Sequence, residues 1–322
     1  MPPKRKAWPL LAPVLWFLAV PAGAQTLETV GTRASGMAGA FVAVASDSSA
    51  VWWNPGALAA GPFVEVALGH GGAGDAGPGS HVASGTTALA LTLPMAGLHV
   101  ARYTVAGAAP ARGPAQASRV AVSQVGVTVV QSLVSGVHVG GTLKYLRGAS
   151  AAELRFGPLS GAVDRARDLD LPDGQGAWDA DLGLAVVHRG WRLGLLARQL
   201  AEPEFGRGGD AVRLGRHVRA GAAFDAAAAG GPPVTVAADV DLTATAGPDG
   251  ARRDVAVGVE HWLRAGRVGV RAGLRASTVD EARPVATAGA SLMVRSGLFL
   301  EISGGSGGSD RHVWGATARV TF

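Results

Sequence analysis

Apolar and polar residues alternate with a period of two along most of this 322-residue chain. In the run 234–242, every second residue from Val234 to Leu242 is apolar, whereas Asp239 and Asp241 lie between them. Side chains of a β-strand point alternately to its two faces, so this run predicts a strand with one apolar and one polar face. The repetition of such runs indicates a chain built mainly of strands.

Strand-like runs recur between short and long connections. They are expected at 63–70, 86–93, 96–104, 120–131, 137–147, 178–188, 191–200, 215–226, 233–242, 252–263, 267–276, 285–295, 297–303 and 312–322. Most links after even-numbered runs are tight turns, whereas links after odd-numbered runs are longer and rich in Gly, Pro, Asp and Ser. Short turns at one end and long loops at the other are typical of outer-membrane barrels. We therefore predict an all-β fold, an antiparallel transmembrane β-barrel of about 14 strands.

Composition supports a barrel in a membrane. Hydrophobic residues make up 48% of the chain, yet no apolar run beyond the first 24 residues is long enough for a transmembrane helix. This leaves a soluble β protein or a membrane barrel, and the alternating loop lengths favour the barrel. The chain has no cysteine, which excludes a disulfide framework and a lipid anchor. Its arginines are scattered without interleaved aromatic residues, so no nucleic-acid surface is expected.

The first 24 residues are expected to be a cleaved signal peptide. Residues 4–6 are basic, residues 8–20 form a short apolar stretch, and residues 22–24 form a small-residue cleavage site before Gln25. An uncleaved anchor is the alternative. The signal predicts export through the periplasm to the bacterial outer membrane.

The last expected strand ends in an aromatic residue. Phe322, Val320 and Trp314 share its apolar face, and this ending resembles the outer-membrane sorting signal of bacterial β-barrels. The resemblance implies barrel assembly machinery as a partner and outer-membrane lipid as the surroundings. Trp178 and Trp191 also lie near strand ends on apolar faces, which fits an interfacial aromatic girdle, with ordinary core positions as the alternative.

A motif at residues 31–58 precedes the first strand and is the most specific feature of the chain. It resembles the N-terminal region of the FadL/TodX family of outer-membrane transporters and equally that of the related PorV group. The chain keeps the shared positions Arg33, Gly36, Met37, Gly39, Ala40, Phe41, Asp47, Ala50, Trp53, Asn54, Pro55 and Leu58. It departs from the motif at Ala38, where glycine is usual, and at Gly56 and Ala57, whose order is usually reversed.

The resemblance implies that residues 25–60 plug the lumen of a barrel at 61–322. For FadL-type proteins it implies passive uptake of small hydrophobic molecules, long-chain fatty acids or hydrocarbons, without a cofactor. For PorV it implies a protein-binding component of a secretion or surface-attachment system, and a barrel kept for membrane architecture is a third possibility. A tunnel, or a gap beside the third run, favours transport, whereas a filled lumen favours partner binding. The sequence leaves two interpretations of the plug: it only seals and stabilises the barrel, or it also gates the passage of a ligand.

Charged residues on the polar faces of three runs are expected to point into the lumen. They are Asp239, Asp241, Asp254, Glu260, Arg267, Arg271 and Arg275. Neighbouring strands then place acids beside bases, and carboxylate–guanidinium pairs brace the wall. An ion-selective lining is the alternative, and the near cancellation of charge favours bracing.

The longest loops are expected at 148–177 and 201–214. Resemblance to FadL-type transporters implies that these loops capture hydrophobic substrate, and their apolar residues are Leu154, Phe156, Leu159, Val163 and Phe205. Self-packing of the loop is the alternative. Asp164, Asp168, Asp170 and Asp173 are common calcium ligands, but their spacing misses the EF-hand register, and no metal site is assigned.

Enzyme motifs are not supported by their context. Residues 304–308 match G-x-S-x-G but are expected in a loop, and residues 69–74 match G-x-G-x-x-G without a following helix. The eight histidines lack metal-ligand spacing. The chain is therefore not expected to be an enzyme.

Overall fold

The strands of the barrel span nearly the whole chain after residue 64. The computed structural model describes residues 30–75, 81–109, 115–155, 162–206, 211–247, 250–280, 282–308 and 311–322. The barrel strands are β1 (Glu65–Asp75), β2 (His81–Leu93), β3 (Ala96–Ala109), β4 (Ala115–Val134), β5 (Val137–Arg155), β6 (Gln175–His188), β7 (Trp191–Arg198), β10 (His217–Asp225), β11 (Val234–Asp241), β14 (Asp254–Leu263), β15 (Val268–Ser277), β16 (Val285–Arg295), β17 (Leu298–Gly307) and β18 (Arg311–Thr321). The expected signal peptide, residues 1–24, lies outside the described residues.

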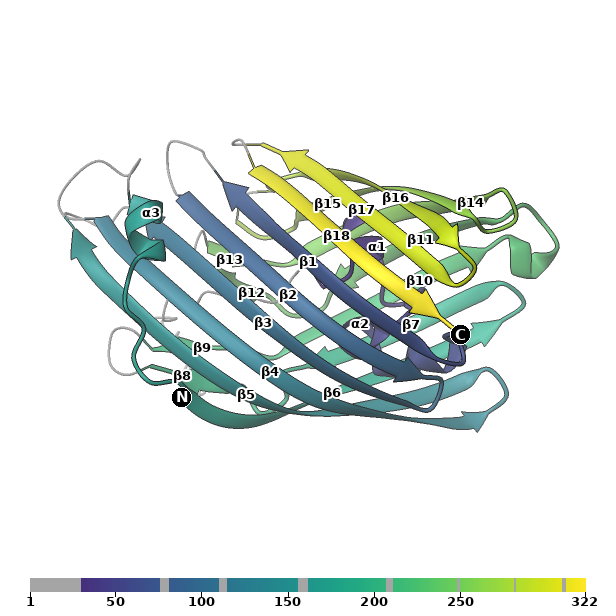
Figure 1. Ribbon diagram of the computed structural model, residues 1–322, viewed down its shortest axis with the longest axis horizontal. Coiled ribbons are helices and arrows are strands. Elements are labelled where there is room, and N and C mark those ends of the chain that lie inside the picture. Colours follow the sequence, from purple (N-terminus) through teal and green to yellow (C-terminus); the bar gives the residue numbers. More distant parts are fainter. Residues whose placement is uncertain are drawn as a thin grey trace, which may run out of the picture.

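Within the described residues these fourteen strands form one closed antiparallel barrel, with β1 paired to both β2 and β18 (Figure 1). The closing pairs run from Glu65 opposite Thr321 to Gly74 opposite His312. Closure satisfies the backbone hydrogen bonds that an open sheet edge leaves unpaired. The predicted fold class is confirmed, and every expected run corresponds to a barrel strand.

Several strands extend further toward the long loops than expected, and two of these differences concern residues that were expected in loops. Residues 148–155 continue β5 as a strand paired with β4, so the following loop begins later than expected. Leu154 is the one large apolar residue in this stretch, so the alternation that marks the other strands is absent there. Residues 304–307 belong to β17 instead of a loop.

Short elements lie before the barrel and in its long loops. Residues 30–60, here called the plug, contain α1 (Thr32–Gly36), α2 (Ala50–Trp53) and the 3-10 helix η1 (Pro55–Ala60). Other short elements are α3 (Ala162–Arg167), η4 (Ala227–Ala229) and two small sheets, β8 (Glu204–Phe205) with β9 (Val212–Arg213) and β12 (Thr245–Gly247) with β13 (Gly250–Arg252). We call the end of the barrel with the tight turns the turn end, and the opposite end the loop end. Among the described residues, no helix has the length and apolar character needed to cross a bilayer.

The outer face of the barrel is apolar. Large side chains such as Leu68, Leu182 and Leu274 are more than half exposed there, and they alternate with buried inward residues. Trp178 and Trp191 are also exposed on this face, near the ends of their strands. This is the arrangement that a hydrocarbon environment favours.

Candidate functional site

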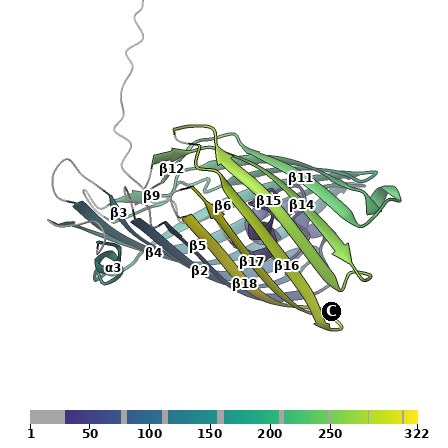
Figure 2. The same ribbon diagram turned by 90° about the horizontal axis from the view of Figure 1, so that it is seen from above.

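The plug lies inside the barrel. Figures 1 and 2 show its helices, in purple, enclosed by the strands. Every residue of α1 and α2 is buried. The Trp53 indole nitrogen donates to the Val30 carbonyl at 2.7 Å, and the Phe41 ring lies edge-on to Trp53 with Met37 fully buried nearby in the same core. The plug therefore has an apolar core of its own.

Inward-facing glycines of the wall make room for the plug backbone. A Cβ atom on Gly140 of β5 would lie 2.3 Å from the carbonyl carbon of Pro55. One on Gly194 of β7 would lie 2.4 Å from the Val42 carbonyl oxygen, and one on Gly273 of β15 would lie 2.3 Å from the carbonyl carbon of Met37. Real side chains do not tolerate such distances. These glycines therefore mark where the plug rests against the wall.

Asn54 joins two turns of the plug to strand β6. Its side-chain amide donates to the carbonyls of Val42 at 2.8 Å and Leu184 at 3.0 Å. Its carbonyl oxygen accepts from the backbone nitrogen of Gly56 at 3.1 Å, which caps η1. Asn54 is fully buried, so removing the amide would leave several buried polar groups unsatisfied. The asparagine–proline step predicted to belong to the plug thus attaches it to the wall.

Arg33 makes the strongest charged contact between the plug and the barrel. Its Nε and Nη2 atoms donate to the two carboxylate oxygens of Glu260 at 2.7 and 2.6 Å. Burial on its own would lower the pKa of Arg33, but the charges of Glu260 and Asp47 outweigh it and hold the pKa above its ordinary value. The guanidinium therefore stays charged, and the bidentate geometry fixes α1 against β14.

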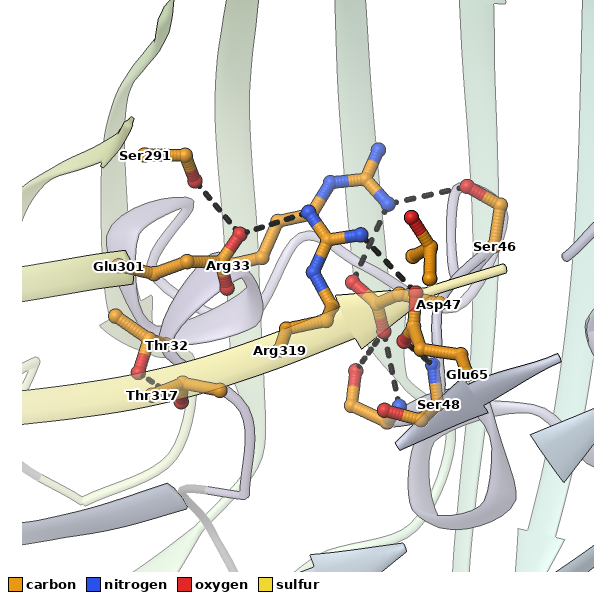
Figure 3. A network of polar contacts seen from close by, with 12 residues as sticks. Thr32, Arg33, Ser46, Asp47, Ser48, Glu65, Ser291, Glu301, Thr317 and Arg319 are labelled. Carbon is orange, nitrogen blue, oxygen red and sulfur yellow. Dashed lines mark hydrogen bonds and ion pairs between the residues drawn. The ribbon is translucent and has the colours of Figure 1, made fainter. Parts of the chain in front are cut away.

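A chain of polar contacts continues from this pair around one side of the barrel, and Figure 3 shows its part from Ser291 to Ser48. Glu260 also accepts from Arg271 Nε at 2.7 Å, and Arg271 donates to Ser291 at 2.7 Å. Ser291 donates to Glu301 at 2.6 Å, and Glu301 accepts from Arg319 at 3.1 Å. The remaining links are from Arg319 Nη1 to Glu65 at 3.0 Å and from the backbone nitrogen of Ser48 to Glu65 at 2.5 Å.

This chain, here called the polar circuit, begins and ends on the plug. It passes through one side chain on each of β14, β15, β16, β17, β18 and β1, and therefore crosses the seam where the barrel closes. Its three guanidinium groups face three glutamates, with Asp47 beside Arg33 at 3.4 Å. Nearly balanced, buried charge supports bracing of the wall over an ion-selective lining.

A second charged cluster contacts the plug from β10 and β11. Asp239 accepts from the backbone nitrogens of Phe41 and Val42, both at 2.9 Å. Asp241 accepts from Arg219 at 2.5 Å and from His217 at 2.8 Å.

A third cluster lies on β5 and β6, where Lys144 bridges Asp181 at 2.6 Å and Asp179 at 3.1 Å. The same aspartates accept from the backbone nitrogens of Gln199 and Ala201, so the cluster holds the beginning of the next loop.

The expected inward charges divide into two groups. Asp239, Asp241, Asp254, Glu260 and Arg271 are buried on inward faces, and Arg275 is half-buried on the inward face of β15. Arg267 was expected inside but lies in the turn before β15 with an exposed side chain. Other strand members of the clusters were missed, although they occupy polar-face positions: Glu65, Lys144, Asp179, Asp181, Arg219, Glu301 and Arg319.

The described residues among those expected to capture substrate do not form a single exposed apolar patch. Phe205 is fully buried, and its ring occupies the space that a side chain at Gly148 would need. Leu154 lies within β5, and Val163 lies on α3 and is half-buried. Phe156 and Leu159 lie outside the described residues. The expected exposed patch is therefore wrong for Phe205, which packs into the core because β5 has no side chain there.

The acidic residues of the same loop form no metal cluster in the described part of the chain. Asp164 pairs with Arg167 at 3.1 Å, and both side chains are exposed. Among the described residues, no three His, Asp or Glu side chains come together as they would around a metal ion.

Two small cavities lie between the plug and the closing strands. One, of about 30 Å³, is lined by Gly31, Thr32, Ala88 and Thr317 among others, and the second, of about 20 Å³, shares these four residues. Each has room for only one or two waters. The Thr32 and Thr317 hydroxyls are 2.6 Å apart, so a neutral hydrogen bond joins the plug to the wall here, beside the bond from Ser48 to Glu65. We call the two cavities and their lining the β1 seam.

The wall beside the third strand is continuous. β3 pairs with β2 from Ala96 to Ala108 and with β4 from Ala96 to Ala109, without a break in register. The gap that would have favoured transport at this place is therefore not found in these described strands.

A larger recess opens at the loop end. Pairing of β5 with β6 ends where Gly148 faces Gln175, although β5 continues to Arg155. A pocket of about 490 Å³ lies at this point, with Ser150 and Asp173 in its lining.

The fold is shared with known channels, although the sequence is not. No protein-family model and no curated protein matches the sequence. The toluene transporter TodX of Pseudomonas putida matches the structure with a TM-score of 0.58 at 12% identity, over 92% of this chain and 99% of that chain. The monoaromatic hydrocarbon channel CymD matches with a TM-score of 0.63 at 12% identity, over 92% of this chain and 98% of that chain.

A FadL homologue of Pseudomonas aeruginosa matches with a TM-score of 0.57 at 11% identity, over 94% of this chain and the whole of that chain. The resemblance drawn from the N-terminal motif is therefore confirmed at the level of the fold. The chain has the closed, plugged β-barrel fold of the TodX, CymD and FadL-type channels.

Proposed function

We propose that this protein is a FadL-type barrel of the bacterial outer membrane that lets small hydrophobic molecules pass by diffusion. The proposal rests on one observation: a closed barrel with an apolar outer face and a docked N-terminal plug has the fold of proteins described as a toluene transporter and a monoaromatic hydrocarbon channel. The N-terminal signal and the aromatic C-terminus support the location. Long-chain fatty acids and hydrocarbons are the candidate cargo.

The β1 seam is the proposed route past the plug. Charged contacts attach the plug to β14, β11 and β10, and close backbone packing attaches it to β5 and β7. The seam instead has small residues such as Gly69 and Ala88, with the cavities already present. A modest shift of the plug away from β1 would join these cavities into a passage. The plug is held here by the neutral Thr32–Thr317 hydrogen bond and by the Ser48–Glu65 bond, whose carboxylate keeps Arg319 when the plug leaves, so this is the side that opens at least cost.

A reversible disulfide across the seam tests this route. The chain has no cysteine, and the short distance between the Thr32 and Thr317 hydroxyls makes T32C/T317C a suitable pair. Uptake of radiolabelled toluene and of oleate is measured in bacterial cells that lack their own channel. We expect uptake by the reduced protein, loss of uptake after oxidation, and no effect of oxidation on either single variant. Uptake no greater than in cells without the protein would refute the transport proposal, and uptake by the oxidised protein would refute the route.

A protein-binding role of the PorV kind is the second candidate. The tightly packed core that the plug forms with the wall, and the continuous wall beside β3 in the described strands, favour it, because such a barrel needs no open tunnel. Copurification separates the two roles. Bound hydrocarbon or fatty acid in the extracted protein supports transport, whereas a stoichiometric partner from a secretion or surface-attachment system supports the second role.

A further inference from the structure

Helix α3 lies outside the barrel, against the wall. Both ribbon views place it beyond β3 and β4 on the side away from the lumen (Figures 1 and 2). Ala166 of α3 is fully buried against Ala106 and Ala117, two small residues on the outward faces of β3 and β4. The Arg119 guanidinium donates to the Leu169 carbonyl at 2.9 Å. A loop that covers the outer wall in this way creates a bounded surface there.

A groove of about 550 Å³ runs along the wall between α3 and the C-terminal strand. Its floor is made of small residues, because Gly72, Gly85 and Thr104 are direct neighbours on β1, β2 and β3. The Trp314 ring stands at one side, half exposed and edge-on to the His70 ring at 5.2 Å. The two sides and the flat floor leave space for a bulky group.

The groove begins where the apolar outer face ends. Toward the loop end, the last large apolar outward residues of β1, β2 and β3 are Leu68, Leu89 and Val100, which are direct neighbours. The next outward row is polar and contains His70, Thr87 and Arg102. The groove lies from this row toward the loop end. In a membrane, this level corresponds to the head groups of the outer leaflet.

The lining of the groove is basic. Arg119, Arg167, His70 and His312 contribute to it, and among the described residues its lining contains no acidic side chain. Arg167 pairs with Asp164, but an exposed ion pair of this kind contributes little, so a phosphate can compete for the arginine. Arginine binds phosphate with paired hydrogen bonds, and the planar Trp314 ring suits the apolar face of a sugar.

We propose that this groove binds the phosphorylated sugar head group of an outer-leaflet glycolipid. The inference rests on the membrane location proposed above, but not on transport. Arg119 and Arg167 contact the phosphate, Trp314 packs on the sugar, and the acyl chains lie along Leu68, Leu89 and Val100. A lipid held here stabilises α3 against the wall.

Native mass spectrometry of the full chain in detergent tests this site, with diphosphorylated lipid A as the probe. We expect R119A/R167A to bind about tenfold more weakly or worse, since charge-assisted hydrogen bonds are lost. R167E keeps the Arg119 contact with α3 and should lose binding too, which separates lipid contact from a folding defect. R216A/R253A removes two arginines elsewhere at the loop end and should bind normally. Wild-type protein should bind dephosphorylated lipid A more weakly.

The proposal would be overturned if R119A/R167A bound diphosphorylated lipid A as tightly as the wild-type protein does. It would also be overturned if the wild-type protein bound dephosphorylated lipid A as tightly as the diphosphorylated form. Displacement of lipid A by a hundredfold excess of inorganic phosphate would assign the groove to free phosphate instead, and displacement by oleate would assign it to cargo. Because lipid binding is measured in micelles and cargo uptake in cells, each proposal can fail while the other holds.

Discussion

Removing the guanidinium of Arg33 should release the plug without unfolding the barrel. Arg33→Met keeps most of the length of the side chain and deletes both hydrogen bonds to Glu260. Breaking a buried ion pair costs about 3–5 kcal/mol, and the lower value applies because Glu260 keeps its bond to Arg271. A loss of about 3 kcal/mol in docking free energy corresponds to an equilibrium shift of about 100-fold toward the released plug.

Native-state hydrogen exchange measures this shift. The backbone nitrogens of Phe41 and Val42 bond to a wall aspartate, and that of Asn54 bonds within α2, so all three report on the docked plug. Their protection should fall about 100-fold, whereas amides in the middle of the barrel strands should keep theirs. Arg192→Met is the matched control, because it removes an arginine that pairs with Asp225 on the wall at 2.6 Å.

Two results would refute this reasoning. If protection fell equally in the plug and the strands, the plug and the barrel would open as one unit, and docking would not be a separate equilibrium. If plug protection did not change, the Arg33–Glu260 pair would make no net contribution, as happens when the desolvation of a buried pair cancels its attraction.

Three further predictions test the wall, the glycine contacts and the seam. Arg271→Ala should lower the melting temperature of the barrel, because it leaves buried carboxylates with fewer partners, but should not change cargo preference; unchanged melting would count against the bracing role. Gly140→Ala should displace the plug and expose it to protease, whereas Gly141→Ala, whose Cβ meets only an ordinary contact at 3.6 Å, should be tolerated; equal protease resistance of the two variants would contradict the packing argument. Ala88→Trp should fill the β1 seam and reduce uptake, whereas Leu89→Trp on the outer face of the same strand should not, and normal uptake by the first variant would exclude this route.

The sequence was sufficient to predict the strands because the two faces of the wall differ in chemistry. Lipid-facing and inward residues alternate at every strand, so a local pattern locates each one. The prediction failed at residues 148–155, where β5 rises beyond the apolar outer face and the pattern disappears. The prediction for Arg267 failed for a related reason, since the alternation was extended backward beyond Val268, the first residue of β15, into the preceding turn.

Local sequence patterns could not predict contacts between residues that lie far apart in the chain. Glu260 and Arg271 were expected inside because of their register, but the pairing of Glu260 with Arg33 joins residues 227 positions apart. Arg33 was identified only through the family motif, which carries no information on its partner. Phe205 shows the same limit, because an apolar loop residue has the same sequence signature whether it is exposed or packed against a glycine such as Gly148.

The relative strength of the plug contacts decides which way the plug can move. On the β14 side, release breaks the buried Arg33–Glu260 pair, at about 3 kcal/mol or more. At the β1 seam, the Thr32–Thr317 hydrogen bond is neutral and contributes about 1 kcal/mol. The Glu65–Ser48 bond also lies beside the seam, but Glu65 keeps Arg319 when that bond is broken. The plug is therefore expected to tilt away from β1 while its Arg33 side stays attached, so that the Arg33–Glu260 end of the polar circuit acts as a hinge and its Ser48–Glu65 end opens.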